Sequence, residues 1–324
     1  MKCANCAHAV EMPSEKHFEK IAVMGAGGVG CYFGGMLARA GVPVTFIGRP
    51  YFVDAVKRDG LFIDSINFQE TIKVDTTTNI VAARDAELVL FCVKTLATEA
   101  SARELAPHVS KNAVVLSLQN GVENVDQIRA ATGIAAIPAV VYVGAAMTAP
   151  GRLKHGARGD LVIGIPRNES GRFPSDALEK IAATFAKASV PCKISDDIER
   201  DLWSKLALNC AGNAITAIAQ VTYGAAARHP MSRELMIETL KEVVAVARAR
   251  GIPLDEEQMV ANGLKFVESV GVVTSSTAND IARKKKTEID ALNGCIARLG
   301  KEKGIATPAN FALTALVKLI ETKF

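Results

Sequence analysis

The sequence predicts an α/β, Rossmann-like parallel-sheet domain followed by an all-α C-terminal domain. Three observations support this fold class. Short apolar strands alternate with helical segments from Lys20 onward, a glycine-rich loop joins the first strand to the first helix, and strand signals nearly vanish after Asp196. Alternating strands and helices are typical of a parallel sheet that is covered on both faces. We therefore expect an extension at 1–19, a sheet domain at 20–196 and a helical domain at 197–324.

Length and composition agree with two domains of a soluble enzyme. The chain has 324 residues, and single hydrophobic cores usually stop growing at about 250–300 residues. A formal net charge of +4 is spread along the sequence, so we expect no nucleic-acid partner. The seven cysteines are odd in number and scattered, which indicates a reducing compartment, the cytoplasm, rather than a disulfide framework.

Neither the N-terminal extension nor an uncharged stretch within the sheet domain predicts a membrane or metal site. Residues 1–19 lack the basic segment and apolar core of a signal peptide. Cys3, Cys6 and His8 form only a single Cys-x-x-Cys pair with one histidine, which is weak evidence for zinc, and we expect no metal. Residues 130–151 carry no charge, but glycines and prolines interrupt them, so we interpret them as buried strand and loop with no membrane span.

The sheet elements follow from short apolar runs that turn residues separate. The expected strands are Ile21–Met24, Val44–Ile47, Leu88–Val93, Val114–Leu118, Ala139–Val143, an edge strand at Leu161–Ile165 and a last strand at Pro191–Ser195. The expected helices of the second domain span about 197–222, 231–250, 255–269, 279–299 and 308–322. Their breaks are marked by Tyr223-Gly224, Gly251-Ile252-Pro253, Gly271 and Gly304, which are plausible stop or cap signals.

The first strand leads into a loop that predicts a dinucleotide site. Glycines at positions 25, 27 and 30 suit a tight bend, close approach of the backbone to a pyrophosphate, and close packing of the helix on the strand. The pyrophosphate then lies on amide groups at the helix N-terminus. A glycine-rich turn alone is weak evidence, but here it follows a strand and opens a helix. The predicted cofactor-binding residues of the loop are Gly25, Ala26, Gly27, Gly28, Val29 and Gly30.

The end of the second strand favours NADPH over NADH. An NAD-preferring site places an acidic residue there for the ribose 2′-hydroxyl, and this chain has none. Arg49 instead follows the strand, and its guanidinium can pair with a 2′-phosphate. The alternative is a solvated loop arginine. Lys94 and Asn120 follow two later strands, and the carboxyl ends of parallel strands are where ligands collect.

A polar stripe on an apolar helix predicts a substrate site. The helix from about Asp197 has no charged residue between Lys205 and Arg228, so most of it must be buried. Lys205, Asn209 and Asn213 recur every four residues and drift only about 40° per step, so they share one face. An exposed polar face is the alternative, but buried amides need hydrogen-bond partners and a polar ligand is one.

Two further candidates lie near the end of the chain. Ser276 belongs to the cluster Thr274-Ser275-Ser276-Thr277, and it either binds a ligand or caps the helix that follows. Glu288 follows Arg283-Lys284-Lys285-Lys286, which by itself is typical of a solvated charged face. The local sequence leaves Glu288 undecided.

Together these motifs resemble the ketopantoate reductase (2-dehydropantoate 2-reductase) family over about residues 20–324. The most specific matches are Trp203-Ser204-Lys205-Leu206-Ala207-Leu208-Asn209-Cys210-Ala211-Gly212-Asn213 and Thr287-Glu288-Ile289-Asp290-Ala291-Leu292-Asn293-Gly294, supported by the glycine loop, Val93-Lys94 and Gln119-Asn120-Gly121-Val122-Glu123.

The resemblance implies reduction of 2-dehydropantoate to pantoate with NADPH, a step towards pantothenate and coenzyme A. It makes Lys205 the general acid that protonates the carbonyl oxygen, with Glu288 as its catalytic partner near the nicotinamide. The same resemblance makes Asn120, Lys205, Asn209, Asn213 and Ser276 substrate contacts, and Lys94, Asn120 and Glu288 cofactor contacts. The chemistry agrees, because a tunable lysine beside a carboxylate can stabilise the developing oxyanion and protonate it.

Some alternatives stay open. The family often has an asparagine about ten residues after the second asparagine of the stripe, where this chain has Thr222-Tyr223, so the substrate is either 2-dehydropantoate or another small 2-keto acid. A non-catalytic NADPH-sensing protein is a third hypothesis, which the pair of Lys205 and Glu288 disfavours. The helical domain is as compatible with a homodimer as with a monomer.

Overall fold

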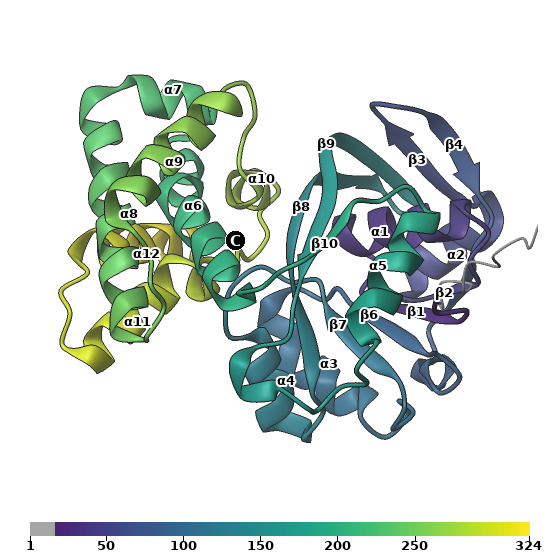
Figure 1. Ribbon diagram of the computed structural model, residues 1–324. Helices are drawn as coiled ribbons and strands as arrows, with labels where there is room; N and C mark the ends of the chain where they lie inside the picture. The colour runs from purple at the N-terminus through teal and green to yellow at the C-terminus, as the bar shows by residue number, and fades with distance from the viewer. Residues whose placement is uncertain (1–16) are drawn as a thin grey trace, which may run out of the picture.

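A computed structural model describes residues 17–324 of the chain. Cys3, Cys6 and His8, with the expected extension, therefore lie outside the described residues, apart from its last three positions. A sheet with helices on its faces lies beside a bundle of helices (Figure 1), and the chain passes from one to the other after β10 (Cys192–Ile194). The predicted fold class, a Rossmann-like sheet followed by an all-α part, is confirmed.

The centre of the sheet is parallel and forms from the apolar runs that the sequence displays. Four strands, β1 (Ile21–Met24), β6 (Leu88–Phe91), β7 (Val114–Ser117) and β2 (Val44–Ile47), are buried along most of their length. The full strand order is β4-β3-β9-β8-β7-β6-β1-β2-β5, with β10 paired to β9. Ile21 of β1 lies in register with Val44 of β2 and Leu88 of β6, so the carboxyl ends of these strands meet at one edge.

Several strands differ from the prediction. β3 (Leu61–Ser65), β4 (Gln69–Ile72) and β5 (Asp75–Thr77) were not expected, because polar residues dilute their apolar pattern. β8 (Ala136–Ala149) and β9 (Arg152–Ile163) form a long antiparallel hairpin, of which only the apolar parts were foreseen. The expectation that Leu161–Ile165 is an edge strand was wrong, since β9 pairs with β8, β3 and β10.

Helices cover both faces of the sheet. On one face α1 (Gly28–Arg39), α2 (Pro50–Asp59) and α5 (Ala177–Lys187) share a core with the strands, and the buried rings of Phe33, Phe46 and Phe185 belong to it. On the other face α3 (Thr98–Leu105) and α4 (Asn124–Thr132) bury Leu105 and Ile128 in a second core. The two cores place the sheet in the middle layer of three.

The C-terminal part packs around one long helix, α6 (Ile198–Ala219), which contacts α8, α9, α10 and α12 as well as strand β8. The other helices are α7 (Tyr223–Arg228), α8 (Pro230–Ala249), α9 (Glu256–Ser269), α10 (Ser276–Ala282), α11 (Asn293–Lys303) and α12 (Pro308–Glu321). Among residues 17–324 no helix is long and apolar enough to cross a membrane.

Two helix boundaries were wrong. Tyr223 and Gly224 open α7 instead of marking a break, because α6 already ends at Ala219, and its C-cap residue Gln220 has a left-handed φ of 52°. The single helix expected at 279–299 is two helices, α10 and α11, joined by a segment in which Lys284 has a φ of 53° and a 3₁₀ turn spans Ile289–Ala291. This joining segment contains Glu288, which a continuous helix would orient differently.

Candidate active site

The turn after β1 has the backbone geometry that only glycine adopts easily. Gly25 has a φ of 103°, and a Cβ on it would lie 2.7 Å from the carbonyl carbon of Cys92 in the neighbouring chain segment. A side chain here would be strained and would also clash with backbone that cannot give way. The loop therefore bends sharply from β1 into α1 at the carboxyl end of the central strands.

Next to this turn, the start of α1 fits a dinucleotide pyrophosphate. The N-cap residue of α1 is Gly27, which has no side chain to cap the helix, and the first turn of the helix contains no acidic residue. A Cβ on Gly27 would meet no atom within 4 Å, so open space lies above the helix N-terminus. Unpaired amide groups and the positive end of the helix dipole together favour a phosphate in such a position.

Arg49 lies at the end of β2, where the sequence predicts contact with the ribose. It is the exposed N-cap residue of α2, directly after β2. Its neighbour Gly48 comes close to the glycine loop, because a Cβ on Gly48 would lie 3.4 Å from Cβ of Ala26. Within residues 17–324 the Arg49 guanidinium has no ion-pair partner, so its donors are available to a ligand.

Lys205 lies at the centre of the site. It belongs to α6, which packs against β8 and directs the Lys205 side chain towards the sheet. Lys205 is half-buried as a residue, and its Nζ donates a hydrogen bond of 2.9 Å to Oδ1 of Asn120 and a second, short one to the carbonyl oxygen of Val141. It also lies 5.6 Å from the ring centre of Tyr142, within the range of a cation–π contact.

Glu288 belongs to the same hydrogen-bonded group. One carboxylate oxygen accepts a bond of 2.9 Å from the backbone amide of Thr95, and the other accepts one of 3.3 Å from Nδ2 of Asn120. Asn120 thus bridges the ammonium of Lys205 and the carboxylate of Glu288 with the two ends of its amide. The backbone carbonyl of Asn120 is itself held by Thr95 and Asn124.

Burial makes Lys205 a tunable acid. Desolvation lowers the pKa of Lys205 to about 8, although the carboxylate of Glu288 opposes this shift. Arg158 lowers the pKa further and Asp160 raises it. These two residues form a two-bond ion pair of 2.9 and 2.6 Å on β9, and the Arg158 guanidinium lies 3.9 Å from the ring centre of Tyr142. A lysine in this environment can exchange its proton near neutral pH.

The two asparagines of the stripe have different surroundings. Asn209, one turn beyond Lys205, is half-buried, and its side chain makes no hydrogen bond with any residue in 17–324. Asn213 is buried, and its Oδ1 accepts a hydrogen bond of 2.6 Å from the hydroxyl of Tyr223. The Tyr223 ring is buried against Phe266, at 5.8 Å between ring centres. Tyr223 therefore restricts what else Asn213 can bind.

The remaining predicted residues lie at the margin. Lys94 follows β6 as expected, but its Nζ pairs with Oδ2 of Asp280 on α10, at 2.6 Å. Capping of α10 is performed by Ser275, whose hydroxyl accepts from the amide of Ala278, so the capping alternative for Ser276 was wrong. Ser276 is the exposed first residue of that helix.

Some residues of the site were missed by the sequence analysis. Thr95, Val141 and Tyr142 contact Glu288 or Lys205, and Arg158 and Asp160 modulate the charge of Lys205. Thr95 directly follows a predicted residue, and Tyr142 lies in a predicted strand, so their positions were visible in the sequence. Arg158 was not, because it lies in a bulged part of β9 with a φ of 54°.

Comparison with known proteins decides the family. A family model described as ketopantoate reductase PanE/ApbA matches residues 21–168, and the model of its C-terminal part matches residues 197–321. The chain belongs to the ketopantoate reductase family. The 2-dehydropantoate 2-reductase of Pyrococcus abyssi is 33% identical over 299 residues, which are 92% of this chain and 97% of that protein.

Solved structures agree with this family membership. A PanE/ApbA family ketopantoate reductase from Ralstonia eutropha JMP134 superposes with a TM-score of 0.85 and 45% identity, over 94% of this chain and 99% of the other. A ternary complex of D-mandelate dehydrogenase with NADH and anilino(oxo)acetate superposes with a TM-score of 0.87 and 26% identity, over 94% and 99%. The protein is an oxidoreductase of this family.

Proposed function

We propose that the protein reduces 2-dehydropantoate to pantoate with NADPH, in the cytoplasm, on the route to pantothenate and coenzyme A. The observation that carries this proposal is the hydrogen-bonded group of Lys205, Asn120 and Glu288. It places a proton donor of lowered pKa beside a carboxylate, which is the arrangement that protonation of a carbonyl oxygen requires. The many relatives named 2-dehydropantoate 2-reductase support the choice of substrate.

In this proposal the dinucleotide is held by the sheet part, residues 20–196. The amide groups at the start of α1, in the loop Gly25, Ala26, Gly27, Gly28, Val29 and Gly30, bind the pyrophosphate. Arg49 pairs with the 2′-phosphate and thereby selects NADPH. Lys94, Asn120 and Glu288 lie at the nicotinamide end. When bound, NADPH supplies the hydride that reduces the ketone carbon.

The helical part, residues 197–324, then supplies most of the substrate contacts. Lys205 protonates the ketone oxygen and stabilises the negative charge that develops on it. Glu288 keeps Lys205 in its charged form and, through Asn120, keeps the ammonium in place. Asn120, Asn209, Asn213 and Ser276 position the substrate, and the unbonded amide of Asn209 is the strongest of these candidates.

The test is the oxidation of NADPH in the presence of 2-dehydropantoate, followed at 340 nm beside a panel of unrelated 2-keto acids. We expect kcat/KM for 2-dehydropantoate to exceed that for pyruvate by at least about 100-fold, since discrimination by built polar contacts is large. An equal rate with all 2-keto acids would reject the proposed substrate. Repeating the assay with NADH tests the preference for NADPH, and we expect the KM for NADH to be higher than the KM for NADPH.

A second candidate substrate is another 2-keto acid, and Tyr223 favours it. This buried aromatic residue occupies the position where the family often has asparagine, and it uses the Oδ1 of Asn213. The similar D-mandelate dehydrogenase, which was solved with NADH and anilino(oxo)acetate, supports this candidate, because anilino(oxo)acetate joins an aromatic ring to a 2-oxo carboxylate. Phenylglyoxylate belongs in the panel, and a preference for it would replace 2-dehydropantoate as the substrate.

A sensing protein is the alternative to an enzyme. A chain that binds NADPH but turns over no 2-keto acid would be such a protein, and Lys205 and Glu288 would then have no catalytic role.

The homodimer stays a prediction. Its candidate contacts are the exposed apolar residues Phe311, Leu316 and Leu319 on α12. Light scattering of the purified protein at micromolar concentration measures the mass directly.

A further inference from the structure

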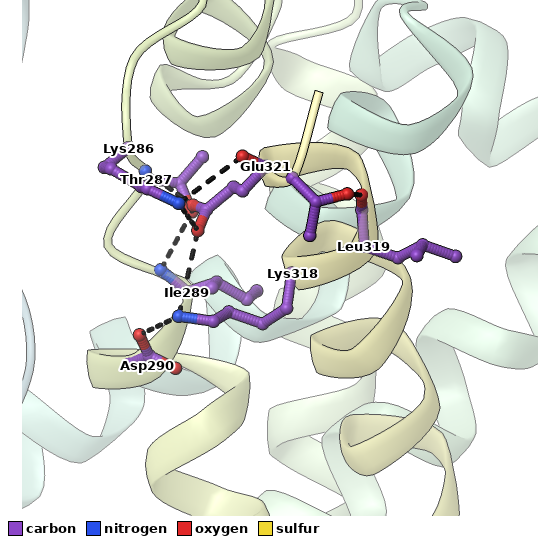
Figure 2. A network of polar contacts seen from close by, with 8 residues as sticks. Lys286, Thr287, Ile289, Asp290, Lys318, Leu319 and Glu321 are labelled. Atoms are coloured by element: carbon purple, nitrogen blue, oxygen red, sulfur yellow. Dashed lines mark hydrogen bonds and ion pairs between the residues drawn. The ribbon is translucent and has the colours of Figure 1, made fainter. Parts of the chain in front are cut away.

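A buried carboxylate at the end of α12 holds the segment that carries Glu288. Glu321 is the last residue of this helix and is only 2% exposed. Its Oε1 accepts two hydrogen bonds from Thr287, one of 2.7 Å from the backbone amide and one of 2.6 Å from the hydroxyl. Figure 2 shows the Glu321 side chain pointing from the helix end directly at Thr287.

Charged groups around Glu321 keep it ionised. Nζ of Lys286 and Nζ of Lys318 lie 3.7 and 3.8 Å from its Oε2. Burial would raise the pKa of Glu321, but the bonds from Thr287 and the two lysines outweigh that effect and hold the pKa below its usual range. Lys318 also pairs with Asp290 at 2.7 Å, so the cluster is close to neutral as a whole.

Thr287 transmits this contact to the site. It is 1% exposed, and its hydroxyl accepts a hydrogen bond of 3.2 Å from the amide of Ile289, so the backbone on both sides of Glu288 is fixed. Glu288 then reaches the amide of Thr95 and the side chain of Asn120. The segment between α10 and α11 has only a short 3₁₀ turn, in which the amide of Ala291 donates to the carbonyl oxygen of Glu288 at 3.0 Å. The bonds from Thr287 to Glu321 support the backbone on the other side of Glu288.

We infer that Glu321 is a positioning residue for the reaction, which acts through Thr287 to hold the Glu288 carboxylate beside Asn120 and Lys205. This inference rests on the proposed function, in which Glu288 keeps Lys205 charged. The C-terminal end of α12 therefore affects the reaction through Glu321, in addition to packing against the rest of the helical part.

The experiment compares Glu321→Ala with Glu321→Gln in the full chain. Alanine removes both bonds to Thr287, so we expect kcat to fall about 10- to 100-fold, the cost of a small misplacement of a catalytic group. KM for NADPH should stay within about twofold. Since a displaced Glu288 no longer raises the pKa of Lys205, the alkaline limb of the kcat profile should also move to lower pH. Glutamine keeps an acceptor for Thr287 and should restore most of the rate.

Two companion variants make the result decisive. Lys318→Ala removes the ion pairs of Lys318 with Asp290 and Glu321 but leaves Lys286 beside Glu321 and both bonds to Thr287, so it should behave like wild type. Thr287→Val deletes the hydroxyl at nearly constant shape, and it replaces Glu321→Ala if that variant does not fold. We expect it to shift the pH limb in the same direction. Thermal unfolding of each variant measures how much folded protein enters the assay.

Each outcome has one meaning. If folded Glu321→Ala, or Thr287→Val in its place, loses rate without moving the pH limb, or loses no rate, the positioning role is refuted. Glu288→Gln, measured beside them, separates this failure from failure of the proposed function. Should Glu288→Gln also leave both kcat and the pH limb unchanged, the proposed role of Glu288 itself is wrong.

Discussion

Lys205 donates a hydrogen bond of 2.9 Å to Asn120, a residue 85 positions earlier in the chain. Lys205 belongs to the helical part and Asn120 to the loop after β7, so the site is complete only where the two parts meet. The amide of Asn120 turns its other end to Glu288, which comes 168 positions later. Three segments that are distant in sequence therefore determine the state of one proton.

Replacement of the proton donor tests this arrangement most directly. Lys205→Ala should lower kcat by about 10²- to 10⁴-fold, the usual contribution of a general acid. NADPH binding should change little, because the loop at the start of α1 lies elsewhere, and fluorescence titration measures it. Lys241→Ala, which removes an exposed lysine of α8, is the matched control. Near-normal turnover by Lys205→Ala would remove this residue from its proposed role.

The pH profile of kcat tests the electrostatics. Reduction needs protonated Lys205, so the rate should fall as pH rises through about 8, the pKa of Lys205 in the folded protein. Glu288 and Asp160 raise that pKa, whereas Arg158 lowers it. Glu288→Gln should therefore move the alkaline limb to lower pH, and Arg158→Gln should move it to higher pH. Shifts in the same direction for both variants would contradict the assignment.

The sequence predicts those parts of the site in which a residue is unusual for its local environment, such as a polar residue in a buried apolar helix. Buried asparagines in an apolar helix need hydrogen-bond partners, and for this reason Lys205, Asn209 and Asn213 could be predicted as a functional stripe. Glu288 breaks no local rule, because the basic run before it looks like an ordinary solvated face. Its role depends on contacts with Thr95 and Asn120, and such long-range contacts leave no periodic trace in the sequence.

The strands of the sheet differ in how clearly their residues predict them. Buried parallel strands such as Leu88–Phe91 are continuous apolar runs and are easily recognised. β9 alternates exposed charges with buried residues and contains bulges opposite β8, so only its apolar end resembled a strand. The end of α10 depends on the left-handed backbone of Lys284, a residue that is not glycine, and such a conformation is not predictable from residue type.

Two glycine variants separate folding from cofactor binding. Gly27→Ala places a methyl group where no protein atom lies within 4 Å, and the φ of −89° suits alanine. We expect unchanged thermal stability but a Kd for NADPH at least about tenfold higher, since the methyl group occupies the space proposed for the pyrophosphate. Gly25→Ala should instead lower the melting temperature, because its Cβ would clash with Cys92. Unchanged NADPH affinity in Gly27→Ala would place the cofactor elsewhere.

Arg49 should control the choice between the two nicotinamide dinucleotides. Arg49→Gln removes the guanidinium but keeps hydrogen-bonding capacity, so NADPH should lose about 1.5–3 kcal/mol of binding free energy while NADH loses little. In kinetic terms the ratio of kcat/KM for NADPH to that for NADH should fall about tenfold or more. Lys57→Gln is the control, because Lys57 is an equally exposed cation in the last turn of α2, at the other end from Arg49. An unchanged ratio would make Arg49 an ordinary solvated arginine.

Tyr223 should decide between the two candidate substrates. Its hydroxyl satisfies the buried Oδ1 of Asn213, so Tyr223→Phe leaves that acceptor unpaired at a cost of about 1–3 kcal/mol. If Asn213 contacts the substrate, KM should rise more than kcat falls. Tyr223→Asn goes further, because it removes the ring and offers a new amide in its place. For a protein selective for aryl 2-keto acids, this variant should gain activity towards 2-dehydropantoate and lose it towards phenylglyoxylate. If instead wild type already prefers 2-dehydropantoate and Tyr223→Asn changes neither rate, Tyr223 supports the helix packing and has no part in specificity.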